Sequence, residues 1–209
     1  MSQEKVWDEI APYWDSYKKK PFGDDDKGNL FEGFIEKGDK KVLDLGCGSG
    51  RNFFKFNGVI YGVDFSSKML KFAEKNAKEL KIKVILKKSS VDKLPFEDNF
   101  FDKALYISAL HCVENDKIRK KSIEELYRVL KPKGKALITV WNKKSKRWRN
   151  NPKEKMVSWS LSSKMKKVMR YYYLYDYEEL KGILENAGFK VVWKNFTDVA
   201  RNIILVVEK

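Results

Sequence analysis

The chain has 209 residues, of which 44 are Lys or Arg and 29 are Asp or Glu, so its formal net charge is +15. This length predicts a single domain with a full hydrophobic core. There is no run of 18 apolar residues and the N-terminus is polar, so we expect no membrane span and no signal peptide. The two cysteines, Cys47 and Cys112, do not make a disulfide framework or a metal set. The plain expectation is a soluble cytoplasmic protein.

The N-terminal segment, residues 1–40, is predicted to be largely helical. Residues 4–20 carry apolar and aromatic side chains at helical spacing, among them Trp7 and Trp14, although Pro12 should kink or restart this helix. A polar turn is expected over 22–28 and a short helix over about 29–36.

A glycine-rich turn follows the first predicted core strand. Val42–Leu45 runs into Gly46, Gly48 and Gly50, with Asp44 two residues ahead of the first glycine. Glycines allow a sharp turn and close approach of a ligand to the main chain, and in a parallel sheet this turn lies at the ligand-binding end. The dinucleotide fingerprint would place its third glycine where Arg51 stands. The spacing therefore favours a different ligand.

Strands and helices then alternate, which predicts a parallel, doubly wound sheet. The expected strands cover 41–45, 59–63, 82–87, 102–107 and 135–141, with helices near 50–56, 66–80 and 116–130. Ser66 is the predicted N-cap of the second of these helices. Asp176 and Glu179 form a capping box for a later helix that ends at Gly188. Two last strands, 189–194 and 202–207, are expected to pair as an antiparallel hairpin at one edge.

A basic insertion, residues 142–172, interrupts this alternation. Between Lys143 and Arg170 there are eleven basic residues and one acid, Glu154, a net +10, and Trp148 and Trp159 lie among them. Alternating cations and aromatics suit single-stranded nucleic acid, which needs phosphates neutralised and bases stacked. A solvated lysine-rich surface is the alternative interpretation.

Five segments in this order resemble the class I S-adenosylmethionine (SAM) methyltransferases. They are 42–50, 59–64, 89–96, 101–111 and 125–138. The resemblance implies a Rossmann-like, doubly wound, seven-stranded, mostly parallel α/β sheet with an antiparallel C-terminal hairpin, and SAM as cofactor without a metal. The cofactor-binding residues that it implies are Asp44, Gly46, Cys47, Gly48, Gly50, Asp64, Phe65, Ser90, Val91 and Ile107. Ser90 stands where the family usually has Asp.

The flanks resemble the tRNA wobble-uridine methyltransferases, which esterify 5-carboxymethyluridine in the anticodon loop. The resemblance is carried by 6–22, Ser108–His111, Val157–Trp159 and Arg170–Tyr175, and it extends over nearly the whole chain. Cys112, Tyr173 and Lys18 depart from the family pattern, in which two histidines and an arginine stand at these positions.

The resemblance also implies roles at the acceptor site. A carboxylate acceptor is already ionised at pH 7 and needs a cation to select it, a role that we assign to Arg170, with His111 beside the methyl-transfer centre as the second catalytic candidate. Residues 1–40 would form a lid over SAM, and 142–172 would bind the tRNA anticodon loop. The predicted substrate-binding residues are Lys18, Lys20, Trp141, Trp159 and Tyr171.

Relatives of this family act with a small zinc-binding activator protein that pairs with the sheet edge. The apolar strand Ile82–Leu86 is the expected edge and the candidate docking strand, although packing on its own helix, guarded by lysines, explains it equally well. Two other functions remain open. One is a small-molecule methyltransferase of quinone or lipid metabolism, and the other is a SAM-binding RNA subunit without catalysis.

Overall fold

The computed structural model describes residues 1–17, 33–161, 166–197 and 199–209. Its strands are β1 (Lys41–Leu45), β2 (Val59–Asp64), β3 (Val84–Lys88), β4 (Phe101–Ile107), β5 (Leu130–Trp141), β6 (Glu154–Leu161), β7 (Lys166–Tyr173), β8 (Lys190–Asn195) and β9 (Asn202–Glu208). Its helices are α1 (Gln3–Tyr17), α2 (Ser67–Leu80), α3 (Asp116–Val129) and α4 (Tyr177–Asn186), with a short 3₁₀ helix, η1 (Leu110–Cys112).

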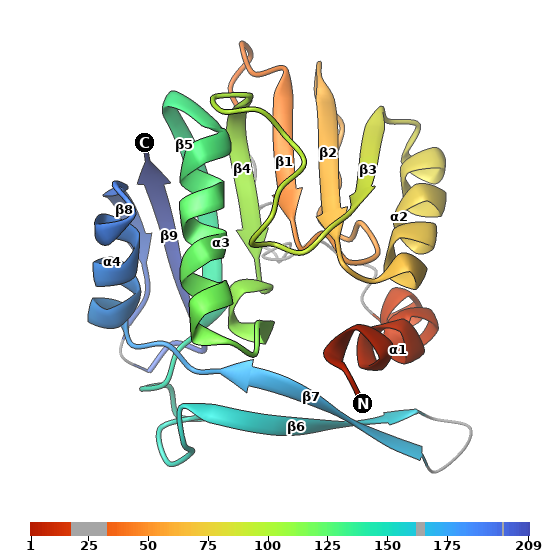
Figure 1. Cartoon of the computed structure of the whole chain (residues 1–209), viewed down its shortest axis with the longest axis vertical. Helices are drawn as coiled ribbons and strands as arrows, with labels where there is room; N and C mark the ends of the chain where they lie inside the picture. Colours follow the sequence, from red (N-terminus) through yellow and green to blue (C-terminus); the bar gives the residue numbers. More distant parts are fainter. Residues whose placement is uncertain (18–32, 162–165, 198) are drawn as a thin grey trace.

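Seven strands form one sheet in the order β3-β2-β1-β4-β5-β9-β8 (Figure 1). The first five are parallel, and β9 runs antiparallel to both β5 and β8. Leu43, Leu45 and Val63 are fully buried, because central parallel strands are covered on both faces. The predicted doubly wound sheet with an antiparallel C-terminal pair is therefore confirmed, and β3 is the predicted edge strand.

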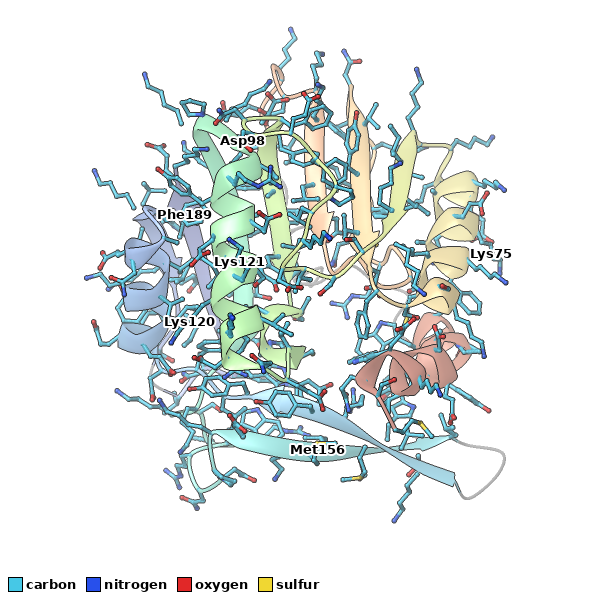
Figure 2. The ribbon with its side chains drawn as sticks, in the orientation of Figure 1. Lys75, Asp98, Lys120, Lys121, Met156 and Phe189 are labelled. Carbon is cyan, nitrogen blue, oxygen red and sulfur yellow. The ribbon has the colours of Figure 1, made fainter. Side chains whose placement is uncertain are left out.

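Local signals account for where two of the helices begin. The Ser66 hydroxyl accepts a hydrogen bond from the Met69 N–H, which caps α2, and the buried face of α2 carries Met69, Ala73 and Ala77. The capping box of Asp176 and Glu179 begins α4 as predicted. Lys75 of α2 and Lys120 and Lys121 of α3 point away from the sheet, on the solvent faces of these amphipathic helices (Figure 2).

The helix predicted near 50–56 is wrong. Residues 51–52 form a turn and 53–56 are irregular. Gly50 has a left-handed φ of +76°, and the Phe53 ring lies so close that a Cβ on Gly50 would be 2.5 Å from it. A regular helix does not form here because the Phe53 ring packs under the turn. Of the short helix predicted over 29–36, only 33–36 are described, and they form a turn and a bend.

The N-terminal helix and the basic insertion both lie at one end of the sheet. Pro12 falls inside α1 without dividing it. The insertion contains the antiparallel hairpin β6–β7, which crosses beneath the carboxyl ends of the parallel strands (Figure 1). In the described part of the chain, no helix is both long and apolar enough to cross a bilayer. The polar turn predicted over 22–28 lies outside the described residues.

Candidate functional site

A cavity of about 430 Å³ lies at the carboxyl ends of β1, β2, β3 and β4. Most of the predicted cofactor-binding residues line it, namely Gly46, Cys47, Gly48, Asp64, Phe65, Ser90, Val91 and Ile107. Asp44 and Gly50 do not line it, but Gly46 and Arg51, which are close to them in the chain, do. The carboxyl ends of parallel strands meet at one edge of a sheet, which is why residues from four separate segments converge here.

The glycine turn is tied to the end of the second strand. Gly46 and Gly48 have φ values of +71° and +54°, a region that favours glycine. The Gly48 N–H donates to Asp64 Oδ2 at 2.9 Å, and the Ser66 N–H donates to Asp64 Oδ1 at 2.8 Å. Burial raises the pKa of Asp64 to about 6, against the lowering effect of these two N–H donors. One carboxylate thus links the turn, β2 and the start of α2.

Asp44 is a buried carboxylate without a hydrogen-bond partner among the described residues. Its side chain is 1% exposed. Burial, and secondarily the negative charge of Asp64, raise the pKa of Asp44 to about 7, while Arg51 acts in the opposite direction. A buried carboxylate in this state is stabilised by a cation. SAM carries a sulfonium and an ammonium group, so the acid and the open glycine turn fit this cofactor.

The raised pKa of Asp44 predicts a pH-dependent stability. Because its pKa is near 3.9 in the unfolded chain and about 7 in the folded one, its favourable contribution is complete below about pH 4 and is lost as the pH rises to 7. The difference in unfolding free energy between wild type and Asp44→Asn should therefore fall by up to about 1.4 kcal/mol per pH unit in this window. Urea unfolding without SAM at several pH values measures it. The surface variant Glu185→Gln is the control, and parallel curves for wild type and Asp44→Asn would contradict the assignment.

Helix α1 forms one wall of the cavity. Gln3, Glu4, Trp7 and Trp14 line it from this helix. Asp8 docks α1 on α2, because its Oδ1 accepts from the Ser66 hydroxyl at 2.6 Å and from the Lys68 N–H at 3.1 Å. The aromatic stripe in the sequence indicated Trp7 and Trp14, whereas no sequence signal identified Gln3 or Glu4.

Arg170 lies on β7 with its side chain buried, at 6% exposure. Its guanidinium lies 4.6 Å from the Trp159 ring, 5.1 Å from the Tyr172 ring and 5.8 Å from the Trp7 ring. Nε is buried without a partner, and no described residue forms an ion pair or hydrogen bond with this side chain. Arg170 is close enough to influence the pKa of Cys112, which lines the cavity. Arg170 does not itself line the cavity, but the Trp7 ring that it contacts does. A buried cation without a counter-ion among the described residues thus lies close to the cavity.

His111 lies in η1, between cavity-lining Ala109 and Cys112, but does not itself line the cavity. Its ring stacks on Trp141 at 5.0 Å and on Tyr172 at 5.5 Å, and its Nδ1 has no partner among the described residues. Burial, and secondarily the positive charges of Arg170 and Arg201, lower the pKa of His111 to about 3. The imidazole is therefore neutral at physiological pH.

The structure separates the predicted substrate-binding residues. Trp159 contacts Arg170, and Trp141 stacks on Tyr172, Trp148 and His111. Tyr171 points to the other face of β7, and its hydroxyl accepts from Arg119 Nη1 at 3.0 Å. Lys18 and Lys20 lie outside the described residues. Stacking of an acceptor base on Trp141 or Tyr171 stays a prediction.

Several proteins with similar sequences are methyltransferases. A family model described as a methyltransferase domain matches residues 36–188. A tRNA (carboxymethyluridine(34)-5-O)-methyltransferase of Arabidopsis thaliana is 34% identical over 139 residues, which is 66% of this chain and 32% of the plant protein. A 2-phytyl-1,4-naphtoquinone methyltransferase of Nostoc punctiforme is 33% identical over 153 residues, 69% of this chain and 57% of that protein.

Solved structures agree on the fold. The CcbJ methyltransferase of Streptomyces caelestis superposes with a TM-score of 0.77 at 16% identity, over 99% of this chain and 98% of that one. The family match covers every segment that lines the cavity except α1. On these grounds the chain belongs to the class I SAM-dependent methyltransferases.

Proposed function

We propose that this methyltransferase esterifies the carboxylate of a 5-carboxymethyl-type uridine at the wobble position of tRNA. The observation that carries the proposal is Arg170, a buried guanidinium without a counter-ion among the described residues. Leaving a buried charge uncompensated is costly, and an anionic acceptor would remove that cost. A guanidinium also matches the two oxygens of a carboxylate in a bidentate pair.

The side chains present suit a carboxylate acceptor. SAM supplies an electrophilic methyl group. The acceptor carboxylate is ionised at neutral pH, so the site needs no general base, and neutral His111 is compatible with this. Arg170 would orient the acceptor oxygen, and alignment is the main catalytic contribution in such a transfer. The aromatic rings around Arg170 would exclude water from the ion pair and so strengthen it.

The basic surface supports RNA as the carrier of the acceptor. Lys144, Lys146, Arg147, Arg149 and Lys167 are exposed, and the described residues offer none of them an ion-pair partner. They belong to the insertion whose hairpin crosses the cavity end of the sheet (Figure 1). Phosphates bound there would hold a neighbouring base close to the cavity, because charge neutralisation supplies affinity while the pocket reads the base.

We also propose that a small zinc-binding activator pairs with β3. This strand is a sheet edge, and Ile85 is exposed on it. An edge with free backbone groups and an exposed apolar side chain suits addition of a strand from a partner. The alternative is that α2 and the flanking lysines already protect this edge.

The test is methyl transfer from labelled SAM to tRNA that bears 5-carboxymethyluridine, followed by nucleoside mass spectrometry. Reactions run with and without the activator, and in parallel with unmodified tRNA and with a demethylated naphthoquinone. The methyl ester should appear only with the carboxymethylated tRNA. Transfer to the quinone alone, or no transfer while SAM still binds, would overturn the tRNA proposal.

A further inference from the structure

The side chain of Gln3 pairs with the backbone of β7, 166 residues later in the chain. Its Nε2 donates to the Met169 carbonyl at 3.3 Å, and its Oε1 accepts from the Tyr171 N–H at 3.0 Å. Gln3 is only 8% exposed, and it lines the cavity at the N-terminal end of α1, which lies beside β7 (Figure 1).

These two hydrogen bonds flank Arg170. In a strand, the carbonyl of one residue and the N–H two residues later point to the same side, so both Met169 and Tyr171 present backbone groups at the edge of β7. A primary amide offers one donor and one acceptor side by side, like a peptide group. Gln3 therefore replaces one residue of a neighbouring strand and fixes the backbone on both sides of Arg170.

The same face of α1 also holds the side chain of Arg170. Trp7 is four residues after Gln3, so both lie on one face of the helix. The Arg170 guanidinium is 5.8 Å from the Trp7 ring. Helix α1 thus contacts both the main chain and the side chain of the cation that we assign to the acceptor, while lining the cofactor cavity.

We propose that Gln3 is a positioning residue for Arg170. It acts through the β7 backbone and sets where the guanidinium meets the acceptor carboxylate. The inference rests on the proposed function for its effect on turnover, but its effect on Arg170 is independent of the acceptor. A misplacement of about 1 Å can lower a rate by roughly a hundredfold, so we expect Gln3→Met to lower kcat/KM for carboxymethylated tRNA about ten- to a hundredfold.

A double-mutant cycle separates positioning from general stability. In the Arg170→Ala background, Gln3→Met should lower kcat/KM by less than about twofold, because the guanidinium that Gln3 positions is gone. The matched control is Lys5→Met, an exposed position on the same helix, which should leave turnover and SAM affinity unchanged. If the fold losses in kcat/KM of the two single variants multiplied in the double variant, the two residues would act independently and the inference would be overturned. Weaker SAM binding in Gln3→Met would also overturn it.

A second measurement observes Arg170 directly. The Arg170 Nε–H resonance of ¹⁵N-labelled protein, assigned with Arg170→Lys, should exchange slowly with water in the wild type because it is buried. Gln3→Met should speed this exchange at least about tenfold, and Lys5→Met should not. An unchanged rate in Gln3→Met would refute the positioning role. If the wild type transferred no methyl group to the tRNA while Gln3→Met still sped the Nε–H exchange of Arg170, the proposed function would be refuted and the positioning role of Gln3 would stand.

Discussion

Replacing Arg170 with alanine is expected to lower kcat/KM for the carboxymethylated tRNA by about 30-fold or more, with SAM affinity unchanged. Truncating one partner of a buried, hydrogen-bonded charge pair costs about 2–5 kcal/mol, and each 1.4 kcal/mol is a factor of ten. The guanidinium makes no hydrogen bond or ion pair with a described residue, but it packs among the rings of Trp7, Trp159 and Tyr172. We therefore expect the main loss in kcat/KM and a drop in Tm of no more than a few degrees. Steady-state kinetics and calorimetric titration with SAM measure the two effects.

Two further variants sharpen this prediction. Arg170→Lys keeps the charge but loses the planar fork of the guanidinium, so its kcat/KM should lie between those of the wild type and Arg170→Ala. Lys190→Ala, on the far edge strand, removes an exposed charge and should change neither quantity. Equal turnover of wild type and Arg170→Ala would remove Arg170 from the acceptor site. A shift of Tm by more than a few degrees would show instead that Arg170 has a structural role.

Gly46→Ala should damage both the fold and cofactor binding. The φ of Gly46 is +71°, and a Cβ placed there would be 2.4 Å from the Cβ of Ala109. A left-handed alanine costs about 1–2 kcal/mol and overpacking a further 1–3, so we expect a loss of about 2–5 kcal/mol. Gly46 and Ala109 both line the cavity, so the relaxation that removes the clash should also weaken SAM binding, by at least about tenfold.

Thermal unfolding and SAM titration test Gly46→Ala. For a chain of this size the loss corresponds to a drop in Tm of roughly 4–20 °C. The matched control is Gly182→Ala in α4, where an added Cβ meets no atom within 4 Å. A helical glycine replaced by alanine should stabilise by about 0.5–1 kcal/mol. If Gly46→Ala retained wild-type Tm and SAM affinity, the close packing of the turn on Ala109 would be refuted.

Two sequence predictions differ in how the structure bears on them. The helix predicted near 50–56 does not form, because Gly50 has a left-handed φ of +76° and the Phe53 ring packs against it. Tyr171 was predicted to bind the acceptor, and this role stays a prediction; in the structure its hydroxyl accepts from Arg119, on the face of β7 opposite Arg170. The contact of Gly50 with Phe53 is local, whereas the hydrogen bond of Tyr171 joins residues that are 52 positions apart.

The amino-acid sequence by itself determined the order of the seven strands of the main sheet and of helices α1 to α4, the parallel sheet, and the turn at Gly46–Gly50, because caps, glycines and apolar periodicity act over a few residues. It also placed most of the cavity lining, since the ends of parallel strands meet at one edge. Only the tertiary structure decided that Arg170 is buried without a counter-ion among the described residues, that His111 stacks behind the cavity wall, and that Gln3 pairs with β7. Burial and long-range backbone pairing are properties of the folded chain, and no local pattern encodes them.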